Sequence, residues 1–172
     1  MATTEISTGE RADLLAALGK QRFFLRHTLR DLTEEQAASR PTVSELCLGG
    51  LIKHVADTER SWADFILDGP AESSGYDEAT VDAWLGRFRM EPGETLEAIL
   101  AQYQEVADRT DQIVRDLPDL DVSHPLPEAP WFEPGAQWSA RRVLLHIIAE
   151  TAQHAGHADI LRETIDGAKS MG

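Results

Sequence analysis

Apolar side chains recur with a helical period in four long segments of this sequence, and this pattern leaves few possible folds. These segments cover about residues 8–31, 51–67, 92–117 and 139–165. Each segment places its apolar side chains on one face and its polar side chains on the other, as an amphipathic helix does. No segment alternates polar and apolar residues in the manner of a half-exposed strand. We therefore expect an all-α protein in which four helices share a core, most simply as a four-helix bundle.

Local sequence signals indicate where several of these helices begin and end. Thr33 and Gln36 have the spacing of a capping box, so a short helical turn is expected there, ended by Pro41. Ser139 is expected to cap the fourth long helix. Gly167 is expected to end it, because glycine readily adopts the left-handed conformation that follows many helices.

The connections between the helices are long. The second helix is expected to begin after the two glycines at 49–50, and an irregular connection rich in Gly, Ser and Pro follows at 68–77. A short amphipathic piece is expected around residues 81–88. Residues 118–138 contain five prolines and are expected to form a long loop without strands. Loops of this length often have a function. The length of the chain predicts one domain over residues 1–172.

Charge and cysteine content narrow the classes of function. The formal net charge of −14 opposes binding to phosphate backbones and anionic headgroups, so nucleic acid and membranes are not expected partners. The N-terminal residues lack the basic and apolar pattern of a signal peptide, and no run approaches the roughly 20 apolar residues of a membrane span. The sole cysteine, Cys47, excludes an intrachain disulfide and is expected to be a buried apolar residue. A cytoplasmic location is therefore expected.

Two polar residues interrupt the apolar face of the fourth helix. Glu150 and His154 are four residues apart, so their side chains are neighbours that can reach one cation. An unpaired carboxylate in a core would be costly, and a metal ion would remove that cost. His54 lies on the apolar face of the second helix and is the expected third ligand. Three protein ligands leave a coordination position open for water or substrate.

Each of these residues also has an interpretation without a metal. A single inward histidine such as His54 is often a hydrogen-bonded core residue, and Glu150 with His154 could be a simple pair on the helix surface. His146 with Glu150, and His154 with His157, have workable ligand spacing too. Both outer histidines rotate toward the edge of the apolar face, so we expect them behind the ligands or in a pocket wall.

Two segments resemble the metal-site signatures of the DinB superfamily, also known as the DinB/YfiT-like metalloenzymes. They are residues 49–56, GGLIKHVA, and residues 150–163, ETAQHAGHADILRE. The common family pattern has one histidine on the second helix and His-x-x-x-His on the last, whereas here Glu150 takes the first place of that pair. This variant resembles the mycothiol-dependent branch, which includes maleylpyruvate isomerases. The resemblance implies a four-helix bundle of DinB/YfiT type with long connecting loops, a divalent metal on His54, Glu150 and His154, and a homodimer.

The resemblance also implies a chemistry. The expected metal is zinc, with nickel, manganese or iron as alternatives, and the expected cosubstrate is a low-molecular-weight thiol, mycothiol or bacillithiol. A thiol with a pKa of about 8.5 is mostly protonated at pH 7, and binding to a metal deprotonates it. The metal-bound thiolate would attack an electrophile, which makes the protein a thiol S-transferase of reactive or xenobiotic compounds.

Two other functions remain open. One is a mycothiol-dependent isomerase of the maleylpyruvate type. That family usually carries a further C-terminal domain, whereas this chain ends ten residues after Arg162, so we place the isomerase second. The other is a non-enzymatic metal-binding or stress-response bundle.

The open side of the metal site is expected to face the long proline-rich loop. Aromatic residues there would wall an apolar pocket, and two arginines at the start of the fourth helix could hold a carboxylate on the thiol or the acceptor. Positive charges at the N-terminus of a helix are unfavourable to the helix dipole, which suggests that the two arginines serve a purpose other than helix stability. His124 is expected to be solvent-exposed in the loop. The residues expected to line the pocket are Trp131, Trp138, Arg141, Arg142 and His157.

Overall fold

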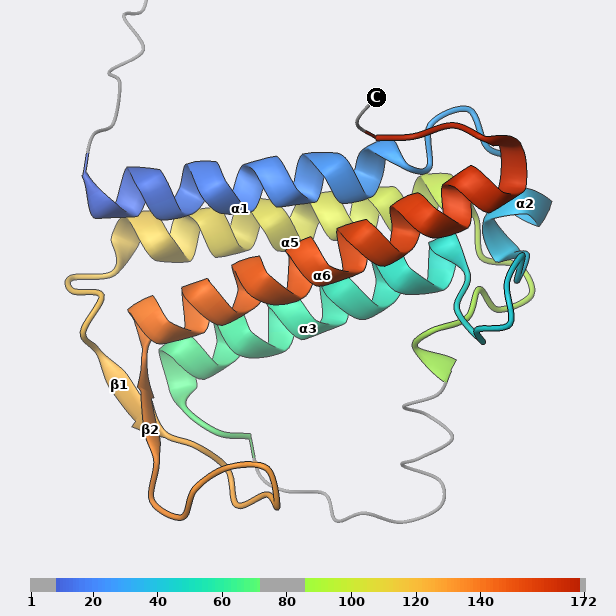
Figure 1. Cartoon of the computed structure of the whole chain (residues 1–172). Coiled ribbons are helices and arrows are strands. Elements are labelled where there is room, and N and C mark those ends of the chain that lie inside the picture. The colour runs from blue at the N-terminus through green and yellow to red at the C-terminus, as the bar shows by residue number, and fades with distance from the viewer. Residues whose placement is uncertain (1–8, 72–85, 171–172) are drawn as a thin grey trace, which may run out of the picture.

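The computed structural model describes residues 9–71 and 86–170 and consists of long helices joined to a small hairpin (Figure 1). The elements are α1 (Glu10–His27), α2 (Glu34–Ala38), α3 (Leu48–Asp68), α5 (Leu96–Asp116), β1 (Ser123–Pro125), β2 (Gln137–Ser139) and α6 (Ala140–Asp166). Helices α1 and α6 run in one direction and α3 and α5 in the other, with α1 packed mainly on α6 and α3 on both α5 and α6. The predicted all-α four-helix bundle is confirmed. Within the described ranges, no helix is long and apolar enough to cross a membrane.

The helix ends follow the capping signals of the sequence. The hydroxyl of Thr33 accepts a hydrogen bond from the Gln36 backbone N–H at 3.2 Å, and the Gln36 side chain accepts one from the Thr33 N–H at 3.0 Å. Ser139 caps α6 by accepting from the Arg142 N–H at 3.2 Å. Gly167 ends that helix with φ 78°, in the left-handed region. The predicted caps are therefore confirmed.

Helix α3 begins earlier than the sequence predicted. It starts at Leu48, with the Cys47 sulfur accepting a hydrogen bond from the Gly50 N–H at 3.4 Å, so the prediction of a start after residues 49–50 is wrong. The glycines lie inside the first turn because another part of the chain approaches them closely. A Cβ atom on Gly50 would lie 1.8 Å from the carbonyl oxygen of Phe88.

The proline-rich connection between α5 and α6 contains strands, contrary to the prediction. Strands β1 and β2 pair antiparallel, with His124 opposite Trp138. Each has only three residues, which is too short for a recognisable alternating pattern. The prediction that His124 is solvent-exposed is also wrong: its ring packs edge-on against Phe65, and its Nε2 lies 3.2 Å from the Ile66 carbonyl oxygen. The piece expected around residues 81–88 falls mostly outside the described residues.

The bundle core consists of two apolar clusters separated by polar residues at its middle. Each long helix contributes one buried polar side chain at this level: Arg22 from α1, Glu59 from α3, Thr110 from α5 and Thr151 from α6. The Arg22 Nε donates to Glu59 at 3.2 Å, and its Nη1 donates to Asp111 at 2.7 Å. The buried charges are therefore paired, as a low-dielectric interior requires. The candidate site lies on the flank of the bundle at about this level.

Candidate metal centre

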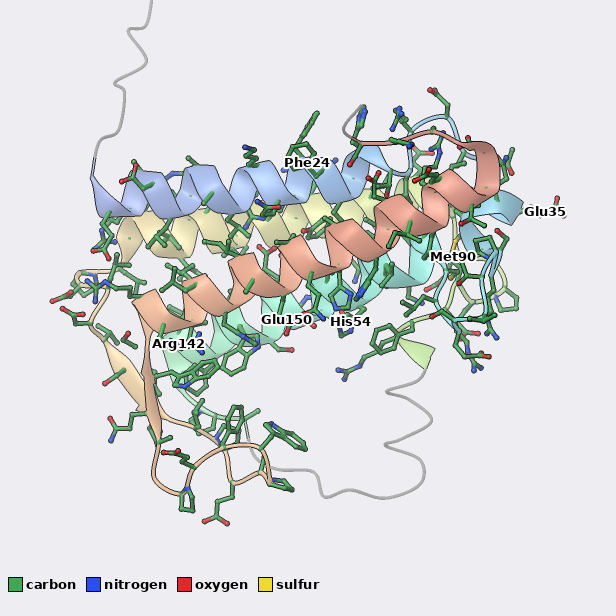
Figure 2. The ribbon with its side chains drawn as sticks, in the orientation of Figure 1. Phe24, Glu35, His54, Met90, Arg142 and Glu150 are labelled. Carbon is green, nitrogen blue, oxygen red and sulfur yellow. The ribbon has the colours of Figure 1, made fainter. Side chains whose placement is uncertain are left out.

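Three predicted ligands meet where α3 packs against α6. His54 comes from α3, and Glu150 and His154 come from α6, and one ligand atom from each lies within 4.8 Å of the other two. The His154 Nε2 is 3.6 Å from a carboxylate oxygen of Glu150, and the His54 and His154 ring centroids are 4.8 Å apart. Figure 2 shows Glu150 and His54 together between the two helices. Across residues 9–71 and 86–170, no other three potential metal ligands cluster in this way.

The cluster lies at the rim of the core, where a ligand from solvent can reach it. The side chain of Glu150 is 31% exposed and that of His154 is 12% exposed. The neighbouring α6 residues Val143 and Ile147 are buried. The acid and the imidazole thus continue the apolar face of α6 to its edge, and one side of the cluster stays accessible.

Burial keeps the two imidazoles neutral at pH 7. Desolvation, together with the charges of His154 and Arg87, lowers the pKa of His54 from 6.5 to about 4. Burial also lowers the pKa of His154, although Glu150 opposes this. Metal ions bind the neutral form of histidine, so these ligands need no deprotonation at neutral pH.

The donor set fits a divalent cation with an open coordination position. Donor atoms bound to tetrahedral zinc at about 2.0–2.2 Å are roughly 3.4 Å apart. In the structure, the three ligand atoms lie within 4.8 Å of one another. Side-chain rotations that bring these atoms about 1 Å closer would therefore allow them to bind one ion. One carboxylate and two imidazoles accept zinc and also nickel, manganese or iron. With three protein ligands, a fourth position is left for an external ligand.

The two outer histidines each adjoin one residue of the cluster. The Nδ1 atoms of His157 and His154 are 3.4 Å apart, so His157 contacts the nitrogen of His154 that faces away from Glu150. Such a contact fixes the orientation of a ligating ring. The Nε2 of His146 lies 4.0 Å from the other carboxylate oxygen of Glu150. Both histidines therefore stand beside the three-residue cluster, outside it.

Phe88 is a residue of this site that the sequence analysis missed. Its ring stacks on His54 with centroids 4.2 Å apart and covers one face of the imidazole. The glycine pair at 49–50 was the sequence feature that could have indicated this contact. Only residues without a side chain allow the segment around Phe88 to approach α3 so closely.

Trp138 and Arg142, two of the predicted pocket residues, form an aromatic and cationic group with Trp62 of α3 beside His146. The indole of Trp138 stacks on that of Trp62 with centroids 4.9 Å apart. Both indoles meet the His146 ring edge-on, at 5.1 Å for Trp138 and 5.0 Å for Trp62. The guanidinium of Arg142 lies 4.2 Å from the Trp138 ring centroid.

Two of the predicted pocket residues lie elsewhere. Arg141 forms ion pairs with Glu10 at the start of α1 and with Asp121 before β1. The expectation that Arg141 holds a ligand carboxylate is therefore corrected, because its donors are occupied on another side of α6. Trp131 is 66% exposed in the loop between the strands. That loop forms a cavity of about 490 Å³ lined by residues between 126 and 135, and none of the three cluster residues lines it.

Comparisons with known proteins identify the family. A crystal structure of a conserved protein from Enterococcus faecalis has a similar fold, with a TM-score of 0.69 and 13% sequence identity over 94% of this chain and 100% of that one. No curated protein matches the sequence. The model of the Mycothiol-S-transferase family matches residues 13–167, which is most of the chain. The predicted resemblance to a mycothiol-dependent family is thus confirmed, and the chain belongs to the mycothiol S-transferase family.

Proposed function

We propose that this protein is a divalent-metal-dependent thiol S-transferase that joins a low-molecular-weight thiol, of the mycothiol or bacillithiol type, to electrophilic or xenobiotic substrates. The observation that carries the proposal is the convergence of His54, Glu150 and His154 from two helices, with their ligand atoms within 4.8 Å of one another. The family to which the chain belongs supports the same class of reaction. Detoxification of reactive compounds is the role that such a reaction would serve.

The chemistry follows from the charge of the donor set. A divalent ion, with zinc as the expected metal, would supply positive charge that favours the deprotonated form of a thiol bound beside it. Glu150 contributes one negative charge and the two histidines contribute none, so the centre keeps a net positive charge for an incoming sulfur anion. In the transfer, a sulfur–carbon bond forms while the leaving group departs with its electron pair, and the thiol proton passes to solvent.

The surrounding side chains hold this centre in place and shield part of it. Phe88 covers one face of His54, which limits water on that side and offers an apolar surface to an acceptor. His157 contacts the rear nitrogen of His154 and so restricts rotation of that ring. The open edge at Glu150 faces His146, where a thiol can enter.

The experiment compares zinc-loaded protein with variants that lack one ligand. Protein is mixed with mycothiol and an alkyl halide that fluoresces after S-alkylation, and the rate of conjugate formation is measured. We expect zinc-dependent conjugation and a loss of at least about 100-fold in His154→Ala or Glu150→Gln, as expected when a metal ligand is removed. Gln153→Ala is the matched control, because Gln153 is an exposed neighbour on the same helix.

Two results would oppose the proposal. A wild-type rate no higher than that of His154→Ala would exclude the transferase reaction. Tight zinc binding together with an absence of conjugation would instead favour a metal-binding bundle without enzymatic activity. Circular dichroism of each variant establishes that a lost rate reflects the site and not unfolding.

A further inference from the structure

A row of four side chains connects the metal centre to the hairpin. Arg142, His146, Glu150 and His154 occur at every fourth position of α6, and residues at this spacing are neighbours on a helix. The rise of 1.5 Å per residue puts the Arg142 and Glu150 backbones about 12 Å apart along the axis. Figure 2 shows both residues along the side of α6 that faces α3. The row therefore extends well beyond the reach of a small thiol bound at the metal centre.

The guanidinium of Arg142 lies over an aromatic ring at the far end of this row. Its guanidinium carbon lies 4.2 Å from the centroid of the Trp138 ring, and Trp138 is itself stacked on Trp62 from α3. A cation over an indole face is attracted by the electrons of the ring. A guanidinium carries five N–H donors in its own plane, so contact with one ring leaves donors that oxygen acceptors can reach.

The donors of Arg142 have no acceptor within residues 9–71 and 86–170. No carboxylate in these ranges forms an ion pair with it, and its side chain donates no hydrogen bond there. The adjacent Arg141, by contrast, pairs with both Glu10 and Asp121. In a chain with 30 acidic residues and a net charge of −14, an arginine stacked on tryptophan but without a carboxylate partner is suited to bind a ligand.

His146 fills the space between this arginine and the metal centre. Its ring meets the edges of Trp62 and Trp138, and its Nε2 is 4.0 Å from Glu150. The surface from Glu150 to Arg142 thus presents an imidazole, two indoles and a guanidinium in sequence. Such a surface combines stacking area with hydrogen-bond donors, which suits a ligand with sugar-type rings and many oxygen atoms.

We propose that Arg142 binds the oxygen-rich body of the thiol cosubstrate while the sulfur end of that thiol lies at the metal centre. The body then extends from Glu150 past His146 toward the hairpin, and the acceptor occupies the opposite side, next to Phe88. This inference rests on the proposed function. Arg142 recognises the thiol through the sugar-type body, so it favours the binding of mycothiol-type thiols over smaller thiols that carry the same cysteine group.

The test uses cobalt(II)-loaded protein, because a sulfur–cobalt charge-transfer band reports sulfur at the metal independently of turnover. The protein is titrated with mycothiol and with N-acetylcysteine, which has the same reactive group without the sugar body. We expect Arg142→Met to weaken mycothiol binding about 10- to 100-fold, as expected for lost hydrogen bonds to a charged group. Its affinity for N-acetylcysteine should stay within about twofold of wild type. Arg141→Met is the matched control and should leave both affinities within about twofold.

The outcomes separate this inference from the proposed function. If both thiols give the charge-transfer band but Arg142→Met weakens both equally, or weakens neither, the assignment of Arg142 is overturned and the transferase proposal stands. If wild-type protein gives no band with either thiol, the proposed function fails, and the inference fails with it. Arg142 is exposed, so its substitution should preserve the thermal unfolding midpoint, which is measured in parallel.

Discussion

The substitution Gly50→Ala tests the close packing that places Phe88 over the metal centre. Gly50 lies in the first turn of α3, and a Cβ atom there would be 1.8 Å from the Phe88 carbonyl oxygen and 2.6 Å from the Arg89 backbone nitrogen. Both are backbone atoms, which cannot rotate away as a side chain can. The segment must therefore move by about 1.5 Å to reach ordinary van der Waals contact, and the Phe88 ring would move away from His54 with it.

The size of the effect follows from two opposing contributions. Overpacking of this severity costs about 3 kcal/mol, the upper part of its usual range. Alanine in place of glycine in a helix returns about 1 kcal/mol, because it reduces the conformational freedom of the unfolded chain. The free energy of unfolding should therefore fall by about 2 kcal/mol, which lowers the midpoint of thermal unfolding by about 4–8 °C in a chain of this size.

Thermal unfolding followed by circular dichroism measures this change, with a chelator present so that only the metal-free bundle is compared. Gly19→Ala is the matched control, because a Cβ atom there meets nothing within 4 Å. It should raise the midpoint by about 1–4 °C. Gly49→Ala should fall between the two, because the atoms it meets belong to the flexible Met90 side chain.

The ranking of the three variants decides whether the packing argument holds. A Gly50→Ala midpoint at or above that of wild type would refute it, as would a larger loss in Gly49→Ala than in Gly50→Ala. Gly50→Ala should also bind zinc more weakly than Gly19→Ala, because it displaces the ring that covers His54.

Two further predictions concern the buried charges and the histidines. Arg22→Met leaves the carboxylate of Glu59 buried without its partner, so the free energy of unfolding measured in urea should fall by about 3–5 kcal/mol. Arg109→Met breaks an exposed pair with Asp64 and should lower that free energy by less than about 1 kcal/mol. Equal losses in the two variants would contradict this prediction. Burial holds the pKa of His54 at about 4 in the fold, below its ordinary 6.5, so the metal-free protein should be fully stable above pH 6.5 and lose stability as the pH falls toward 4. His54→Gln should flatten that loss in urea unfolding series, and an unchanged pH profile would count against it.

Those parts of the site that depend on one helix were predictable from the sequence. The spacing of Glu150 and His154, the cap at Ser139 and the stop at Gly167 all depend on residues close together in the chain. Their geometry is set by the helix itself. The choice of His54 as partner required only the assumption that two apolar faces meet, which the bundle satisfies.

Contacts between distant segments without a local pattern were not predictable. Arg141 and Arg142 were both predicted from the sequence to hold a ligand carboxylate. Successive residues of a helix, however, point about 100° apart. One therefore pairs with carboxylates before β1 and on α1, and the other stacks on Trp138. The cover of Phe88 over His54 likewise depends on a connection whose course the helical period does not determine.

X-ray absorption spectroscopy of the zinc-loaded protein reports directly whether His54, Glu150 and His154 bind one metal ion. The spectrum should show two imidazole nitrogens and one carboxylate oxygen, at about 2.0–2.2 Å, with a further exchangeable ligand. His54→Ala should lose one imidazole shell, since His54 is the contribution of α3 to the cluster. An unchanged spectrum in His54→Ala, or a sulfur ligand from Cys47 in the wild-type protein without added thiol, would contradict the proposed metal centre.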